Sequence, residues 1–198
     1  MINEIINREW TFFDKVQHVE GRASCQDNFE KFKMFRQCQF TTFDECVNES
    51  YLQDLKDYET IGLNPIMLKY AYMMETSDAD GYQKIVDQLP MVGEQTKLII
   101  DEIVKLEMTM LYDFQLKYPN LASRLRVLSS DQDEIGNVSF ETYLRSELKT
   151  YGPKTLSNFG KMIVRMTKNH ENIVMMTQFE TVKYYGYKTL EEADEAMK

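Results

Sequence analysis

Apolar residues recur at intervals of three and four along most of the chain, the spacing that places side chains on one face of an α-helix. The first run predicts a helix over residues 3–18, ended by Gly21. Its apolar members are Ile2, Ile5, Ile6, Phe12, Phe13 and Val16. A second helix, with Ser24 or Asp27 as its N-cap, follows from the spacing of the phenylalanines. These are Phe29, Phe32, Phe40 and Phe43.

Turn-forming residues delimit the elements that follow. The sequence Gly62-Leu63-Asn64-Pro65 predicts the end of a helix over residues 48–61 and the start of another that runs to about residue 76. Further helices are expected over residues 80–89, from Pro90 to residue 117, over residues 139–151 with Ser139 as cap, and over residues 153–169. The long helix after Pro90 is predicted to face the core with Leu98, Ile99, Ile103, Leu106, Met110 and Phe114.

Two segments are less regular. Residues 129–138 are polar and acidic with no period and are predicted to form an exposed loop. Residues 173–187 are rich in β-branched and aromatic side chains, which suit a strand as well as a helix, and we predict a helix. Thr189 and Glu192 form the pattern of a capping box for the last turns. With only 8 Gly and 4 Pro in 198 residues, the pattern predicts an all-α fold: a single domain over residues 1–198, a bundle of about ten helices with short connections.

Charge and hydropathy exclude several classes of partner. A net charge of -9, with acidic residues along the whole chain, argues against nucleic acid or an anionic lipid surface as the main partner. No apolar run approaches the roughly 18 residues that a membrane span needs. The first residues alternate polar and apolar side chains without the apolar block of a signal peptide. We therefore expect a cytoplasmic protein with no membrane partner.

The cysteines indicate neither a disulfide framework nor a metal site. Cys25, Cys38 and Cys46 are an odd set without a C-x-x-C pair, so reduced thiols and no metal are expected. His18 with these three thiols would be an irregular zinc set. Phosphate-binding glycine loops, H-E-x-x-H helices, nucleophile-elbow serines and di-iron Glu-x-x-His pairs are absent, and the sequence names no cofactor.

The most unusual local sequence is Gly21-Arg22-Ala23-Ser24-Cys25-Gln26-Asp27, at a predicted helix start. Unpaired N–H groups and the helix dipole favour an anionic ligand, or a thiolate on Cys25, at such a position. Cys25 is thus a weak candidate nucleophile, with His18 or His170 as the available imidazole bases. The alternative is structural: Gly21 ends one helix, Ser24 and Asp27 cap the next, and Cys25 fills the core.

Charged residues within apolar stripes give a second signal, because burying a lone ion is costly and implies a partner. Arg36 shares the face of the phenylalanine stripe, Glu9 lies with Ile5 and Phe12, and Glu75 lies with Leu68, Ala71 and Tyr72. Glu141 and Arg145 are four apart and suit a pair along one helix. These groups converge either on a polar cavity between helices or on buried salt bridges. Trp10, the single tryptophan, would stack on a ligand or on Arg36, or pack in the core.

The same residues carry a resemblance that covers nearly the whole chain. Trp10, the segment Gly21–Asp27, Met34-Phe35-Arg36-Gln37-Cys38-Gln39-Phe40, Lys69-Tyr70-Ala71-Tyr72-Met73-Met74-Glu75 and the run from Phe140 to Leu148 resemble the bacterial family catalogued as domain of unknown function 4125. The resemblance implies an accessory or substrate-binding role beside a nucleotidyltransferase-like partner. It also marks Arg22 to Asp27, Arg36, Glu75, Glu141 and Arg145 as the positions of interest.

Two functions remain open, and the sequence does not decide whether the protein is an enzyme. The first is binding of a small anionic or nucleotide-like ligand in an inter-helix pocket around Arg22–Asp27 and Arg36. The candidate ligand-binding residues are Trp10, Arg22, Ser24, Cys25, Gln26, Asp27, Arg36, Glu75, Glu141 and Arg145. The second is a protein-interaction or accessory module for a nucleotidyltransferase-like partner, in which the same residues serve as salt bridges and caps.

Overall fold

A computed structural model describes residues 1–16 and 24–198 of the chain. Within these ranges the structure has eleven α-helices and three short 3₁₀ helices, and no strand beyond one isolated bridge between Glu134 and Asn137. The prediction of an all-α fold is confirmed. The elements are α1 Ile2–Phe13, η1 Ser24–Asp27, α2 Phe29–Thr41, α3 Glu45–Ile61, α4 Pro65–Ser77, α5 Ala79–Gln83, η2 Val86–Gln88, α6 Glu94–Lys117, α7 Pro119–Ala122, η3 Ser130–Gln132, α8 Phe140–Leu148, α9 Pro153–Lys168, α10 Ile173–Tyr184 and α11 Leu190–Ala196.

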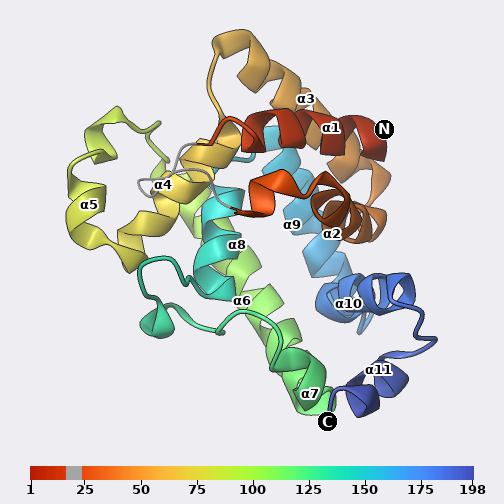
Figure 1. Cartoon of the computed structure of the whole chain (residues 1–198). Coiled ribbons are helices and arrows are strands. Elements are labelled where there is room, and N and C mark those ends of the chain that lie inside the picture. The colour runs from red at the N-terminus through yellow and green to blue at the C-terminus, as the bar shows by residue number, and fades with distance from the viewer. Residues whose placement is uncertain (17–23) are drawn as a thin grey trace.

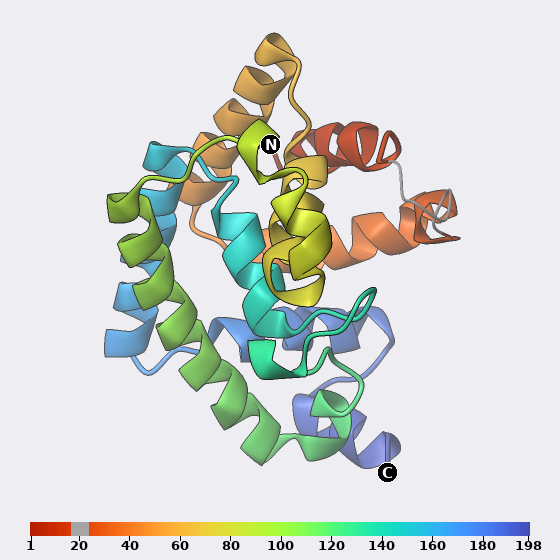
Figure 2. The ribbon, with the colours of Figure 1, turned by 90° about the vertical axis from the view of Figure 1, so that its left-hand side faces the viewer.

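The helices pack as a bundle whose central elements are far apart in the sequence. Helix α1 lies beside α2 and also packs on α3 and α4 (Figure 1). Helices α4 and α8 lie side by side in the middle of the molecule, and the long α6 runs along one edge, packed on α8, α9 and α10 (Figure 2). The core between them includes the fully buried Ile5, Phe40, Leu55, Phe114 and Leu148. This arrangement brings α1, α2, α4 and α8 around a common space.

The turn between α3 and α4 forms as its sequence predicts. Gly62 ends α3 with a positive φ of 69°, a conformation that glycine adopts without strain. The side chain of Asn64 accepts hydrogen bonds from the backbone N–H groups of Ile66 and Met67, and Pro65 occupies the first helical position. Asn64 also donates to the Phe12 carbonyl at 2.8 Å. The cap of α4 is therefore tied to the end of α1.

The ends of α1 and α2 differ from the prediction. Helix α1 ends at Phe13 and not near residue 18, and the buried Gln26 amide donates to the carbonyls of Phe13 and Val16 at 2.8 and 3.0 Å. The Phe13 carbonyl also accepts from the Val16 N–H at 3.0 Å, so Gln26 holds together the turn that follows α1. Neither Ser24 nor Asp27 caps α2, because both lie in η1; the cap is Asn28, whose side chain accepts from the Lys31 N–H. Gly21 lies outside the described residues.

Three other boundaries or faces differ. Helix α3 begins at Glu45, and Asn48, predicted to start it, is buried and donates to the Phe40 carbonyl at 2.9 Å. The helix predicted over residues 80–89 divides into α5 and η2. In α6, Leu98 and Ile99 are 62% and 40% exposed, whereas Ile100 and Val104 are buried. Packing on α8, α9 and α10 selects that buried face, and α6 has apolar side chains on more than one side.

The segment with ambiguous composition is helical, since α10 covers Ile173–Tyr184 with the Asn172 side chain as its cap. Ser139 caps α8 and α9 begins at Pro153 after Gly152, as predicted, whereas α8 ends at Leu148 and not at residue 151. Among the residues described, no helix is both long enough and apolar enough to cross a membrane.

Candidate functional site

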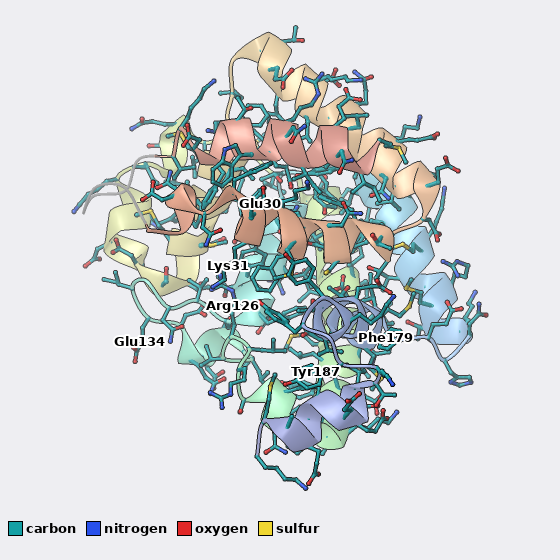
Figure 3. The ribbon with its side chains drawn as sticks, turned by 45° about the vertical axis from the view of Figure 1, so that its right-hand side comes forward. Glu30, Lys31, Arg126, Glu134, Phe179 and Tyr187 are labelled. Atoms are coloured by element: carbon teal, nitrogen blue, oxygen red, sulfur yellow. The ribbon has the colours of Figure 1, made fainter. Side chains whose placement is uncertain are left out.

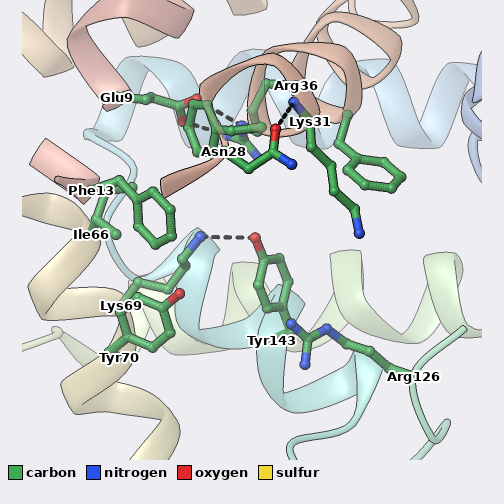
Figure 4. A pocket seen from close by; sticks show the side chains of 12 residues that line it. Glu9, Phe13, Asn28, Lys31, Arg36, Ile66, Lys69, Tyr70, Arg126 and Tyr143 are labelled. Carbon is green, nitrogen blue, oxygen red and sulfur yellow. Dashed lines mark hydrogen bonds and ion pairs between the residues drawn. The ribbon is translucent and has the colours of Figure 1, made fainter. Parts of the chain in front are cut away.

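A cavity of about 450 Å³ opens between α1, α2, α4, α8 and the segment that precedes α8 (Figure 4). That volume lies within the range of small-molecule sites. Its walls combine cations and aromatic rings with a single carboxylate. The lining residues are Glu9, Phe13, Asn28, Lys31, Phe32, Phe35, Arg36, Ile66, Lys69, Tyr70, Arg126 and Tyr143.

One wall is a buried ion pair between α1 and α2. The Arg36 guanidinium binds both oxygens of the Glu9 carboxylate, with the Nε–Oε2 distance at 2.7 Å. Tyr51 donates to Glu9 Oε1 at 2.7 Å, and the Arg36 Nη1 donates to Gln39 at 2.6 Å. Glu9 is fully buried and Arg36 is 7% exposed. A bidentate pair of this kind fixes both side chains in orientation.

A second carboxylate extends this network behind the cavity. Glu147 of α8 lies 3.2 Å from Arg36 Nη2 and 3.5 Å from the Lys69 ammonium of α4. Lys69 also donates to the Tyr143 hydroxyl at 2.9 Å (Figure 4). Two cations and two carboxylates are thus shared among four helices, α1, α2, α4 and α8. The pairing meets the requirement that buried charges be neutralised and hydrogen-bonded.

The charges around Glu147 set its ionisation. Burial opposes the charged form, but Lys69 and Arg36 outweigh it and lower the pKa of Glu147 to about 2. The pKa values of Arg36 and Lys69 are raised despite burial, by Glu9 and Glu147 for the arginine and by Tyr143 and Glu147 for the lysine. All three groups are therefore charged at neutral pH.

The pKa of Glu107, in α6, is shifted in the opposite direction from that of Glu147. Its side chain is buried, one carboxyl oxygen has no hydrogen-bond partner, and no cation within ion-pair distance joins it among the described residues. Burial first, and then the charge of Glu147, raise the pKa of Glu107 to about 8. At pH 7 Glu107 is mostly protonated and adds little negative charge behind the cavity.

Lys31 and Arg126 face the same cavity without a carboxylate. The Lys31 side chain extends from α2 toward Tyr143 and Arg126 (Figure 4), and both cations lie on the same side of the molecule (Figure 3). Arg126 donates to the Val138 carbonyl at 3.3 Å and lies 4.8 Å from the centre of the Tyr143 ring. Over residues 1–16 and 24–198, neither cation forms a salt bridge. Their charges are available to a ligand.

The polar groups that reach the cavity are almost all hydrogen-bond donors. The Tyr143 hydroxyl accepts from Lys69, so its own hydrogen can be donated to a ligand. Asn28 uses its amide oxygen on the Lys31 N–H and presents its NH₂ as a further donor. The acceptor oxygens of Glu9 already serve Arg36 and Tyr51. The cavity is complementary to a ligand rich in acceptors.

The apolar side of the cavity continues into an aromatic cluster. Phe13 and Phe32 stack at 5.3 Å, and Trp10 meets Phe13, Phe29 and Phe32 edge-on or tilted at 5.1–5.8 Å. Trp10 therefore packs against the phenylalanine rings, two of which line the cavity, and does not line the cavity itself. Phe35, by contrast, lines it and is 43% exposed. Its ring is open to a planar ligand group.

The structure places the predicted candidates in three settings. Arg36 lines the cavity, and its interpretation as a buried charge that needs a partner is confirmed by Glu9. Gln26 is fully buried and holds the end of α1, and Asp27 is exposed in η1, the residue before Asn28. The side chains of Ser24 and Cys25 lie outside the description, as does Arg22, and their roles as ligand or nucleophile stay predictions.

Glu75, Glu141 and Arg145 do not line the cavity. The sequence predicts Glu75 within an apolar stripe, but its side chain is 48% exposed and pairs with Lys149. Arg145 lies 3.5 Å from Glu141, as the spacing predicts, and also pairs with Asp101. Glu141 additionally accepts from the Ser130 N–H at 3.0 Å. These three residues tie α8 to its neighbours.

The sequence analysis does not single out five residues of the cavity and its ion network. These are Lys31, Lys69, Arg126, Tyr143 and Glu147. Lys69 lies in the stripe of Ile66 and Met73, and Glu147 in that of Leu144 and Leu148, so the criterion that selected Arg36 would have found both. Lys31 and Arg126 are surface-type cations with no such signal. Only the cavity between α2 and the segment before α8, which both residues line, relates them in space.

No cluster of metal-binding side chains occurs in the described part of the chain. Cys38 is buried on the opposite edge of α2, and burial raises the pKa of its thiol. The Cys38 thiol is thus the less reactive, protonated form at neutral pH.

The fold and the site define an all-α protein with a cationic cavity between helices. A family model described as protein of unknown function (DUF4125) matches residues 1–195, and the chain belongs to this family. That description assigns no activity. Comparison with curated proteins and comparison with solved structures each found no match.

Proposed function

We propose that the protein binds a small anionic ligand in the cavity between α1, α2, α4 and α8. The observation that supports this most strongly is the charge of the lining. In a chain of net charge -9, four cations and one carboxylate face one cavity. Arg36 and Lys69 are held by Glu9 and Glu147, whereas Lys31 and Arg126 have no carboxylate within the described residues. Such a local reversal of charge attracts and retains an anion.

Thermal unfolding against a panel of anions tests the proposal. The panel contains nucleotides, sugar phosphates, carboxylates and amino acids, with divalent metals as a separate arm. A ligand at about 100 times its dissociation constant adds roughly 2.7 kcal/mol to the free energy of unfolding. We expect an anion to raise the Tm of the wild type and the shift to shrink in Lys31→Met and Arg126→Met. No shift with any anion would contradict the proposal.

The segment before Asn28 is tested separately in the same thermal unfolding experiment. Arg22 lies outside the described residues, and we retain it as a further candidate for anion binding on the sequence pattern alone. We expect Arg22→Ala to reduce the ligand-induced shift. An unchanged shift would assign the segment a structural role, with Gln26 as its anchor.

A second candidate function is an accessory module for a nucleotidyltransferase-like protein. It is supported by three large apolar side chains on the solvent side of α6: Leu98, Tyr112 and Leu116 are 62%, 45% and 84% exposed. Their spacing places them on one face. The expected result is that Leu98→Ser and Leu116→Ser weaken complex formation with such a partner in sedimentation velocity runs. An equal complex with both variants would remove α6 from consideration.

A further inference from the structure

The charge of the cavity matches one chemical class of ligand. Lys31, Arg36, Lys69 and Arg126 carry four positive charges, and the paired Glu9 and Glu147 carry two negative charges. Glu107, the other buried carboxyl behind the network, is mostly protonated at pH 7. The surplus is therefore about two positive charges, located on Lys31 and Arg126. A phosphate monoester carries between about -1.5 and -2 charges at this pH, whereas a carboxylate carries one.

The donors match the same class. Lysine and arginine can only donate, and the Tyr143 hydrogen and the Asn28 NH₂ face the same space. A phosphate group offers three terminal oxygens, all acceptors, and two cations on different elements can each take one of them. Arg126 comes from the segment before α8 and Lys31 from α2 (Figure 4), so an anion between them would hold the two sides of the cavity together.

The remaining part of the cavity is too large and too apolar for phosphate alone. Phe35 presents an exposed ring, and Phe32, Ile66 and Tyr70 complete the lining beside it. Rings gain energy by stacking or edge contacts with a planar ligand group. A volume of about 450 Å³ leaves room for such a group next to the cations.

We infer that the ligand is a phosphate monoester that carries a planar ring, with the phosphate between Lys31 and Arg126 and the ring against Phe35. The inference rests on the proposed anion site and specifies its substrate class. Arg36 and Lys69, held by carboxylates, shape the wall, while Tyr143 donates to the phosphate. Nucleoside 5′-monophosphates are the simplest probes of this class.

Calorimetric titration at pH 7 compares probes that differ in one feature each. The probes are the common ribonucleoside 5′-monophosphates, the matching neutral nucleosides, inorganic phosphate, and benzoate as a ring with one carboxylate. We expect at least one monophosphate to bind about tenfold or more tightly than its nucleoside, inorganic phosphate and benzoate, since charge-assisted hydrogen bonds and ring contacts each contribute at this scale.

Matched variants separate the site from general charge effects. Lys31→Met and Arg126→Met should each weaken the monophosphate about tenfold or more and leave binding of the neutral nucleoside unchanged. Lys33→Met and Arg124→Met remove the same charges two residues away, from exposed or half-exposed positions outside the cavity, and should not weaken binding. Circular dichroism melting verifies that all four variants fold.

Each contrary result has a distinct meaning. Benzoate binding as tightly as the monophosphates would overturn the assignment to phosphate and leave the anion site intact. Inorganic phosphate binding as tightly would overturn the part played by the ring. Binding by none of these probes overturns the inference, and the proposed function falls with it only if the broader anion panel also gives no thermal shift.

Discussion

At the scale of single residues, the molecule uses buried ionisable groups in two contrasting states. Glu147 has two cations within 3.5 Å and stays charged, whereas Glu107 lacks a cation among the described residues and holds a proton at pH 7. The difference arises from neighbours and not from burial, since both side chains are about 5% exposed or less. Removing one member of a buried ion pair leaves the others without neutralisation, which costs more than the pair itself contributes.

Glu147→Gln should therefore be strongly destabilising. The amide keeps the shape of the side chain but leaves Arg36 and Lys69 with only Glu9 as a counter-ion. We expect the free energy of unfolding to fall by about 3–5 kcal/mol, measured by urea denaturation at pH 7. Glu171→Gln, which breaks a pair with Arg165 whose side chains are 41% and 44% exposed, is the control and should cost about 1 kcal/mol or less. Equal losses in the two variants would contradict the description of the network.

At the scale of elements, local chemistry sets the ends of helices and tertiary packing sets their faces. The turn from α3 to α4 follows from Gly62, Asn64 and Pro65 alone. By contrast, the N-cap of α2 is Asn28 because η1 occupies the residues before it, and the buried side of α6 depends on three helices packed against it. The sequence therefore misplaces such ends by up to five residues: α1 ends at Phe13 and not near residue 18, and α3 begins at Glu45 and not at Asn48.

Gly62→Ala tests the turn directly. Nothing lies within 4 Å of an added Cβ, so the cost comes only from the positive φ of 69°. We expect a loss of about 1–2 kcal/mol in the free energy of unfolding, the cost of the left-handed region for a residue with a Cβ. Gly93→Ala, where φ is -65° and space is also open, has no left-handed strain. The weaker N-cap and the lower entropy of the unfolded chain oppose each other there, and we expect a net change of only a few tenths of a kcal/mol.

Both the oxygen and the NH₂ group of the Asn64 amide should contribute to the free energy of unfolding. Asn64→Ala removes the cap of α4 and the bond to the Phe12 carbonyl, and we expect a loss of about 1–2 kcal/mol. Asn64→Ser retains a capping oxygen and loses the donor to Phe12. Chemical denaturation should place the serine variant between the wild type and the alanine variant. A serine variant as unstable as the alanine variant would show that the tie to α1 outweighs the cap.

At the scale of the whole molecule, the pH dependence of stability combines the two buried glutamates. The pKa of Glu147 is lowered from 4.5 to about 2, so its contribution is present above pH 4.5 and is lost as the pH falls toward 2. The pKa of Glu107 is raised from 4.5 to about 8, so the folded state retains a proton that the unfolded chain releases. Between pH 4.5 and 8 this group therefore makes the folded state less stable as pH rises.

Glu107→Gln should remove that second dependence. An amide has no proton to lose, and we expect the variant to gain a few kcal/mol over the wild type as the pH is raised from 5 to 8. Urea denaturation at several pH values within this window measures the difference. Glu102→Gln, on the exposed side of the same helix, should follow the wild type. A constant difference between Glu107→Gln and the wild type across the window would refute the raised pKa.

The fold was largely predictable, and the cavity only in part. Helical spacing and turn residues predicted an all-α fold, and the segment at 173–187 is helical. Arg36 and Glu9 were recognisable because a charge within an apolar stripe demands a partner. Lys31 and Arg126 were not, since an exposed cation has the same local pattern whether it faces open solvent or a cavity. Their proximity depends on the packing of segments about a hundred residues apart in the sequence.

The ion network has a consequence for how the chain folds. Arg36 and Glu147 are 111 residues apart, so their contact closes a long loop and requires α1, α2, α4 and α8 to be docked already. An intermediate in which α8 has detached would leave Lys69 without a carboxylate partner and Arg36 with Glu9 alone. The free energy of such an intermediate is raised by the lost packing of α8 and by the loss of Glu147 as a counter-ion. We therefore expect the network to couple these distant segments in unfolding, so that α8 does not detach independently of α2 and α4.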